Sequence, residues 1–156
     1  MNLKDVLETE QVQHLDLSRY CRIESGTSVR DALANMRAER TSAALITQDD
    51  KLIGIFTERD VLRRVAGVSE SLDGPVDEVM TVKPITILPD TSAADALWLM
   101  NDHHFRNLPV VDRQEKIVGH MTHATIIGYL GRRYPVEVLN RSPRPERFPR
   151  KQEGGD

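Results

Sequence analysis

The chain has 156 residues, of which 39% are apolar and 29% are charged, and its formal net charge is -3. These values are ordinary for a globular protein, and the charge gives no electrostatic reason to expect binding to nucleic acid or to a membrane. The single cysteine, Cys21, excludes an intramolecular disulfide and a cysteine-based zinc site, and no apolar run approaches membrane-spanning length. The first residues do not resemble a signal peptide, so we expect a cytoplasmic protein.

The first fifteen residues carry Leu3, Val6, Leu7 and Val12 among charged residues, a pattern compatible with a short amphipathic helix. We expect this segment to pack on the rest of the chain or on a second subunit. A role at a membrane surface is not favoured, because its charges are mixed rather than basic.

The chain then predicts a helix over 28–38, where a Ser-x-x-Asp cap at Ser28 precedes an apolar stripe at helical spacing. Two apolar strands follow over 43–47 and 51–56, joined by a short polar turn, as a hairpin requires. Another helix begins after the second strand and is predicted to end at Gly67.

The start of that helix has two interpretations. Thr57 is placed as the N-cap and Asp60 falls at the third helical position, so the two side chains could form a capping box and bind nothing else. Alternatively, the Asp60 carboxylate could accept two hydrogen bonds from a vicinal diol such as ribose, while the helix N-terminus favours a nearby anion.

An internal repeat makes the second interpretation stronger. Residues 27–36 and 91–100 are identical at six of ten positions at an offset of 64. We place one inserted residue near 103–104, after which the offset is 65 and strand 43–47 corresponds to 108–112. Each half of about sixty residues is too small to fold comfortably alone. We therefore expect two halves packed sheet against sheet about a pseudo-two-fold axis, with two equivalent clefts.

These motifs resemble a tandem pair of CBS (cystathionine-β-synthase) domains, the Bateman module. The resemblance covers about residues 15–131 and is carried by segments 54–60, 90–97, 108–112 and 116–119. It implies an α/β fold of two βαββα repeats packed sheet to sheet. The implied division of the chain is an N-terminal segment (1–15), a first CBS domain (16–70), a linker with a second CBS domain (71–131) and a tail rich in Pro and Arg (132–156).

The resemblance also implies an adenosine-containing ligand between the halves: AMP, ADP or ATP, with NAD or S-adenosylmethionine also possible. Thr57 and Asp60 would hold the ribose, and cations such as Lys83 and Arg106 would meet phosphates. The full set of expected ligand-binding residues is Thr57, Arg59, Asp60, Val82, Lys83, Ile85, Phe105, Arg106 and Asn107.

The corresponding motif of the second half keeps the cap threonine, Thr122, but has Thr125 where the first half has Asp60. A threonine cannot offer two acceptor oxygens to a diol. The second cleft is therefore expected to be degenerate, empty or differently occupied, and its expected residues are Arg40, Thr41, Ser42, Thr122 and Thr125.

Other chemistry finds little support in the sequence. His103, His104, His120 and His123 lie in the second half, but no cysteine or carboxylate completes a convincing metal-ligand set. No nucleophile and base stand at a recognisable spacing, so we expect no enzymatic activity. The tail is expected to be extended, disordered or laid along a partner subunit.

Two functions therefore remain open. The first is a regulatory nucleotide sensor that binds AMP, ADP or ATP in the cleft between the halves, forms a homodimer and acts on an unidentified protein partner. The alternative is a ligand-free dimerisation or scaffold module in which Thr57 and Asp60 only cap a helix.

Overall fold

Two similar halves, each a small sheet with helices, make up the computed structural model of the chain, which describes residues 2–134. The first half comprises β1 (Cys21–Glu24), α2 (Val29–Ala38), β2 (Ala43–Gln48), β3 (Lys51–Thr57), α3 (Glu58–Asp60) and a π-helical continuation, η2 (Val61–Val65). The second comprises β4 (Thr81–Val82), α4 (Ala93–His103), β5 (Asn107–Val111), β6 (Ile117–Thr122) and α5 (His123–Arg133). Short helices precede and connect them: α1 (Leu3–Thr9), η1 (Val12–His14), η3 (Ser69–Asp73) and η4 (Val76–Glu78). The predicted α/β fold of two βαββα repeats is confirmed.

The repeated helices begin and end in the same way. The hydroxyl oxygens of Ser28 and Ser92 accept hydrogen bonds from the backbone N–H groups three residues later, at 3.1 and 3.0 Å. At the other end, Arg40 and His104 both adopt left-handed backbone conformations, with φ of 55° and 58°. These residues lie 64 positions apart, so the repeat keeps that offset beyond both helices.

The position of the inserted residue differs from the prediction. Ala43 pairs with Thr57, and Asn107 pairs with Thr122, so the offset is still 64 at the start of β2 and β5. It becomes 65 only across the β5–β6 turn, so the placement of the insertion near 103–104 was wrong. Strands β2 and β5 are buried along almost their whole length, and a continuous apolar run does not define register as alternation would.

The two halves exchange their lead-in segments. The sheet of the first half has the order β1-β2-β3-β4, and its last strand, Thr81–Val82, comes from the chain that leads into the second half. In the opposite direction, the carbonyl of Leu17 accepts a hydrogen bond from the N–H of His120 in β6, at 2.9 Å. Each half is therefore completed by the segment of chain that leads into the other half.

Glycine makes both exchanges possible. A Cβ added to Gly54 would lie 2.4 Å from Sδ of Met80, and one added to Gly119 would lie 2.3 Å from Cβ of Leu17. Both distances are too short for real Cβ contacts, so these two positions of the strands accept only glycine without a shift of their neighbours.

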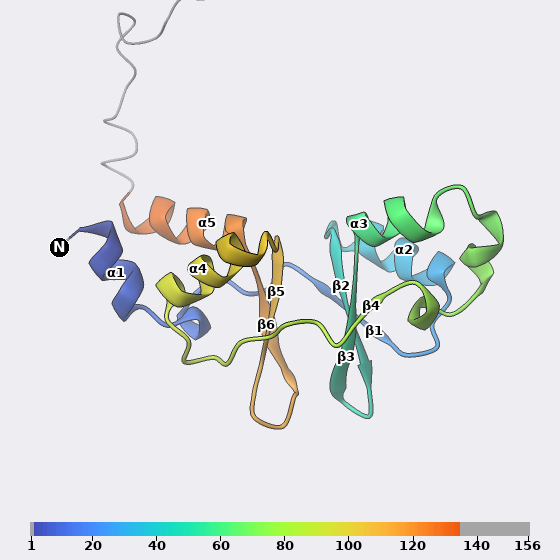
Figure 1. Cartoon of the computed structure of the whole chain (residues 1–156), viewed down its shortest axis with the longest axis horizontal. Coiled ribbons are helices and arrows are strands. Elements are labelled where there is room, and N and C mark those ends of the chain that lie inside the picture. Colours follow the sequence, from blue (N-terminus) through green and yellow to red (C-terminus); the bar gives the residue numbers. More distant parts are fainter. Residues whose placement is uncertain (1, 135–156) are drawn as a thin grey trace, which may run out of the picture.

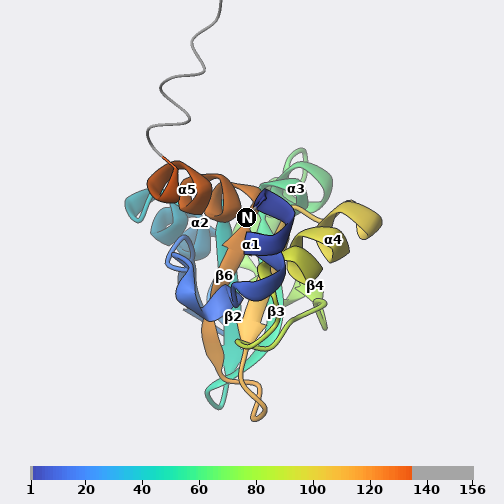
Figure 2. The same ribbon diagram turned by 90° about the vertical axis from the view of Figure 1, so that its left-hand side faces the viewer.

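The N-terminal segment belongs to the packing of the second half. Val12 is fully buried with the second half's core, and its N–H donates to the carbonyl of Thr91 at 2.9 Å. Val76 is buried in the same way in the first half, and its N–H donates to the carbonyl of Thr27 at 2.7 Å. Figure 2 shows α1 beside α4 at the end of the molecule that faces the viewer, and the residue contacts agree. The N-terminal segment therefore packs on the second half, one of the two arrangements expected for it.

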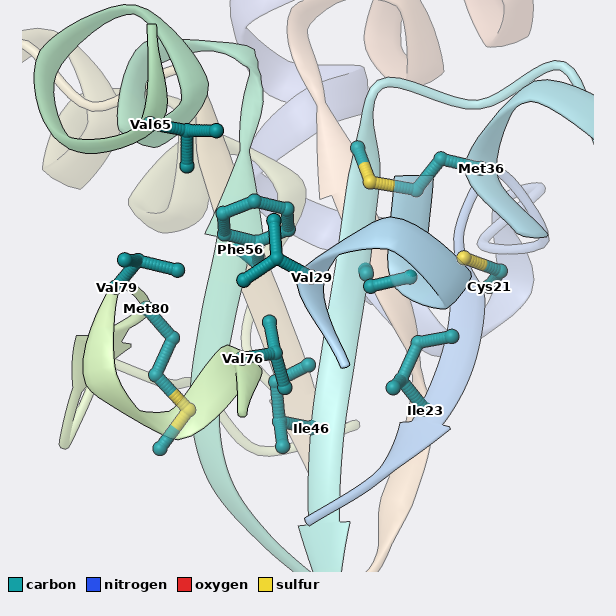
Figure 3. Close-up of a cluster of buried hydrophobic side chains, with 12 residues drawn as sticks. Cys21, Ile23, Val29, Met36, Ile46, Phe56, Val65, Val76, Val79 and Met80 are labelled. Atoms are coloured by element: carbon teal, nitrogen blue, oxygen red, sulfur yellow. The ribbon is translucent and has the colours of Figure 1, made fainter. Parts of the chain in front are cut away.

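Three groups of buried side chains stabilise the fold. In the first half, Phe56 lies among Val29, Val65 and Val76, as Figure 3 shows. The second half has its own core around Met100, Leu108 and Met121. A third group joins the two sheets and consists of Leu45, Leu52, Ile55 and Val111, with Tyr20 and Ile117 partly buried against them. This last group confirms the expected sheet-to-sheet packing.

The arrangement gathers the helix starts in one region. In Figure 1 the β2–β3 and β5–β6 turns lie at the bottom, whereas α3 and α5 begin at the top of the strands, near the middle of the molecule. No helix between residues 2 and 134 is long and apolar enough to cross a membrane. Most of the predicted tail, from residue 135, lies outside the described residues.

Candidate ligand-binding site

The carboxylate of Asp60 makes three hydrogen bonds within the protein. Its Oδ2 atom accepts from the N–H of Thr57 at 2.9 Å and from the Thr57 hydroxyl at 3.4 Å. Its Oδ1 atom accepts from the hydroxyl of Thr81 at 3.0 Å. Only 5% of Asp60 is exposed. The residue therefore caps α3, as one interpretation expected, and also ties the helix start to β4, which sequence reasoning did not foresee.

A cavity of about 560 Å³, here called the Asp60 cavity, lies beside this carboxylate. It is formed by both halves: the first supplies the end of β3 and the start of α3, and the second supplies its lead-in segment and the chain before β5. Eight of the nine residues predicted for the equipped cleft line it, namely Thr57, Arg59, Asp60, Lys83, Ile85, Phe105, Arg106 and Asn107. The structure thus brings these eight residues together.

Val82 is the exception. This residue is 59% exposed and lines a different cavity, together with Met80 and Pro84. The reason is the alternation of side chains along a strand: Thr81 points toward Asp60, so its neighbour Val82 points to the opposite face. The prediction that Val82 lines the same slot is therefore corrected.

Several cavity residues were missed by the sequence analysis: Ile55, Arg63, Arg64, Thr81 and Pro84. Some signal for them existed. Thr81 belongs to the Met-Thr pair of the second lead-in segment, and Arg63 and Arg64 stand one helical turn beyond Asp60, where side chains share its face. Arg64 is the most constrained of them, because its guanidinium donates to the carbonyls of Val79 and Met80 at 3.3 and 2.7 Å.

The Asp60 cavity has an excess of positive charge. Five cationic side chains line it, Arg59, Arg63, Arg64, Lys83 and Arg106, against the single carboxylate of Asp60. None of the five takes part in an ion pair with another described residue. Its apolar lining comes from Ile55, Pro84, Ile85 and Phe105. Such a combination suits a ligand with one flat apolar part and one anionic part.

The second predicted cleft is also present. A cavity of about 960 Å³, the Thr122 cavity, is lined by Arg40, Thr41, Ser42 and Thr122, as predicted. Thr125 does not line it: only 3% of this residue is exposed, and its hydroxyl oxygen accepts a hydrogen bond from the N–H of Thr122 at 2.9 Å. Thr125 thus caps α5 as Asp60 caps α3, but it brings no carboxylate.

The two cavities meet at shared residues. Thr57, Arg59, Arg106 and Asn107 line both of them. The shared arginines place positive charge at the junction, where an anionic group in either cavity would find it.

The histidines of the second half have different surroundings. His103 stacks on Phe105 with ring centroids 5.2 Å apart, and His123 lines the Thr122 cavity. His120 is fully buried, and burial lowers its pKa to about 4. Among residues 2–134, no group of three or more His, Cys, Asp and Glu side chains is arranged to hold a metal ion.

The chain resembles known proteins over most of its length. The family model for the CBS domain matches it twice, over residues 17–67 and 76–132. The CBS domain-containing protein CBSCBSPB3 of Arabidopsis thaliana is 41% identical over 108 residues, which are 68% of this chain and 19% of that protein. The chain thus spans about a fifth of the length of the plant relatives it matches.

Solved structures show the same fold. The CBS domain pair of protein MJ0100, in complex with 5'-methylthioadenosine and S-adenosyl-L-methionine, has a TM-score of 0.70 at 22% identity, over 80% of this chain and 98% of that one. The cytosolic domain of the Mg²⁺ channel MgtE, in complex with ATP, has a TM-score of 0.66 at 24% identity, over 81% and 51%. The two family matches, the repeated halves and the exchanged lead-in segments agree, and the chain belongs to the CBS domain family as a tandem pair of CBS domains.

Proposed function

We propose that this CBS domain pair is a regulatory sensor that binds an adenine nucleotide, AMP, ADP or ATP, in the Asp60 cavity. The observation that carries the proposal is the buried Asp60 carboxylate at the edge of a cavity lined by five cations. The two oxygens of the Asp60 carboxylate can accept hydrogen bonds from a vicinal diol, and the cations can bind phosphates. Both kinds of group lie in one cavity of sufficient size.

Each part of the nucleotide has a matching surface. The ribose hydroxyls would donate to Asp60, and the adenine would lie against Ile55, Ile85 and Phe105. The phosphates would extend toward Arg59 and Arg106 at the junction of the two cavities. The nucleotide-type ligands held by the MgtE and MJ0100 structures support this ligand class, and NAD or S-adenosylmethionine remain secondary candidates. We expect no metal to be required.

The bond between Asp60 and Thr81 offers a way for the ligand to act. A ribose hydroxyl that donates to Oδ1 of Asp60 would compete with the Thr81 hydroxyl, the donor that now holds β4, for that oxygen; β4 is a strand of only two residues. Binding would thereby alter how the second lead-in segment sits on the first half.

We propose that a protein partner recognises this change and that the sensor acts in the cytoplasm as a homodimer without catalytic activity. Leu62 and Ile127, at equivalent positions of the two halves, are 74% and 68% exposed and could supply the apolar contacts of a dimer.

The second candidate is a scaffold or dimerisation module without a ligand. It is favoured by one specific observation: all three hydrogen bonds of Asp60 are made by protein donors, so the carboxylate already has a structural role. In that case the exposed Leu62 and Ile127 would matter and the Asp60 cavity would not.

Isothermal titration calorimetry with AMP, ADP, ATP, NADH and S-adenosylmethionine, in the presence of EDTA, separates the two. The matched control is Asp60→Thr, because Thr125 shows that a threonine can cap a helix at the equivalent position. We expect one of the nucleotides to bind wild-type protein and the variant to lose at least about thirtyfold in affinity, as expected when hydrogen bonds to a charged group are removed. Binding that Asp60→Thr leaves unchanged would refute the site, and no binding of any of the five would favour the scaffold.

A further inference from the structure

A hydrogen-bonded polar pair, His120 and Asn107, lies at the junction of the two cavities. Nε2 of His120 in β6 and Oδ1 of Asn107 in β5 are 2.8 Å apart. The two residues occupy diagonal positions of the β5–β6 ladder, since Asn107 pairs with Thr122 and Pro109 with His120. His120 is fully buried, with the ring of Tyr20 meeting it edge to face at 6.3 Å between centroids. Asn107 is only half-buried and lines both cavities.

The hydrogen bonds of His120 indicate which ring nitrogen carries the proton. Nδ1 is buried and has no partner among the described residues. A buried N–H without an acceptor is rarer and more costly than a buried acceptor without a donor. The favoured tautomer therefore has the proton on Nε2, which donates to Oδ1 of Asn107.

This tautomer fixes the orientation of the Asn107 amide. With Oδ1 held by the histidine, the NH₂ group is the polar end of the amide that is left to meet a ligand in the two cavities that Asn107 lines. No acceptor among the described residues receives a hydrogen bond from this NH₂ group. Arg59 and Arg106 line the same two cavities, so an acceptor bound there would also be attracted by positive charge.

The first half shows that the pair is not needed for packing. At the positions equivalent to Asn107 and His120 it carries Ala43 and Ile55, both buried and both apolar. The same fold therefore accepts an apolar pair at this point of the hairpin. Burial of a polar pair costs free energy that an apolar pair does not, so packing alone does not account for the pair in the second half.

We propose that His120 is a positioning residue that locks the Asn107 amide so that its NH₂ group donates to a phosphate oxygen of the bound nucleotide. The identity of the ligand rests on the proposed function, whereas the locked amide does not. The pKa of His120, lowered to about 4 by burial, agrees with a neutral ring that keeps this bond unchanged at physiological pH.

Two measurements test the proposal on the full chain. The first needs no ligand: long-range ¹H–¹⁵N correlation NMR of wild-type protein reports the tautomer of His120. We expect the proton on Nε2, and a proton on Nδ1 would overturn the proposal. This result stands even if no nucleotide binds, so the failure of the proposed function and the failure of the locked amide can be told apart.

The second measurement is titration with ATP of His120→Ile, Asn107→Ala, the double variant and His120→Gln. The isoleucine reproduces Ile55 of the first half, and the glutamine can still donate to Oδ1 of Asn107. We expect His120→Ile and Asn107→Ala each to weaken binding about tenfold, the double variant to lose no more than either, and His120→Gln to retain most of the affinity. Wild-type affinity in His120→Ile, or full additivity in the double variant, would overturn the proposal. A loss in His120→Gln equal to that in His120→Ile would also overturn it, because a purely structural role of the imidazole would then suffice.

Discussion

The hydroxyl of Thr81 donates a hydrogen bond of 3.0 Å to Oδ1 of Asp60 and so joins the chain leading into the second half to the helix start of the first. The other exchange does not repeat this contact, because Leu17, 64 positions before Thr81, has no hydroxyl that could donate to the residue at position 125. The Ser18 hydroxyl donates instead to Asp16, two residues before it, and Thr125 binds only within its own cap. The two exchanged segments are thus attached to their host helices in different ways.

Thr81→Val should destabilise the fold because it removes the only donor to Oδ1 of Asp60 among the described residues. We expect a loss of about 1 to 2 kcal/mol in the free energy of unfolding, the usual cost of leaving a buried charged acceptor unpaired. Urea denaturation followed by circular dichroism measures it. Ser18→Ala is the matched control and should change stability by less than about 0.5 kcal/mol. Equal losses in the two variants would contradict the asymmetry.

Gly54→Ala and Gly119→Ala should both destabilise the protein, but to different extents. The new methyl group at position 54 would meet the sulfur of Met80, the far end of a flexible side chain. At position 119 it would meet Cβ of Leu17 and lie 3.0 Å from the Leu17 carbonyl oxygen, neither of which can rotate away. We expect about 1 kcal/mol for Gly54→Ala and about 3 kcal/mol for Gly119→Ala by urea denaturation. The reverse order would mean that the Leu17 backbone yields more easily than the Met80 side chain.

The stability of the protein should fall as the pH is lowered from about 6.5 toward 4, because of His120. Burial lowers the pKa of this residue from 6.5 to about 4, so the unfolded chain takes up a proton in this window while the folded chain does not. Its stabilising contribution is complete above pH 6.5, and about 2 kcal/mol of it should be lost between pH 7.5 and pH 5. Denaturation curves at pH 7.5, 6.5 and 5 check this. The same series on His120→Ile should lack this component, and an unchanged pH dependence in the variant would assign it to other groups.

Val12→Ala should destabilise the second half as strongly as Val76→Ala destabilises the first. Both valines are fully buried at equivalent positions, and each N–H bonds to the lead-in of the helix it covers. We expect about 2 kcal/mol for each variant from the lost apolar burial and the cavity that remains. A loss below about 0.5 kcal/mol for Val12→Ala alone would show that residues 10–15 can detach from the core at little cost.

The sequence determined the features that depend on close spacing along the chain. The caps at Ser28 and Ser92, the capping of α3 by Thr57 and Asp60, and the replacement of that carboxylate by Thr125 all join residues three positions apart, where helix geometry fixes what can meet. The internal repeat and the resemblance that its motifs carry then led to the correct fold and to eight of the thirteen residues that line the Asp60 cavity.

Only the tertiary structure decided how distant segments share these halves. Val12 and Leu17 lie with the second half, and Thr81 closes on Asp60 while Val82 turns away. Asn107 meets His120 across a hairpin whose turn holds the inserted residue that the sequence analysis placed earlier. Nothing in local spacing fixes such contacts. They depend on which buried strand faces can be covered and on two glycines that let another segment of chain come close.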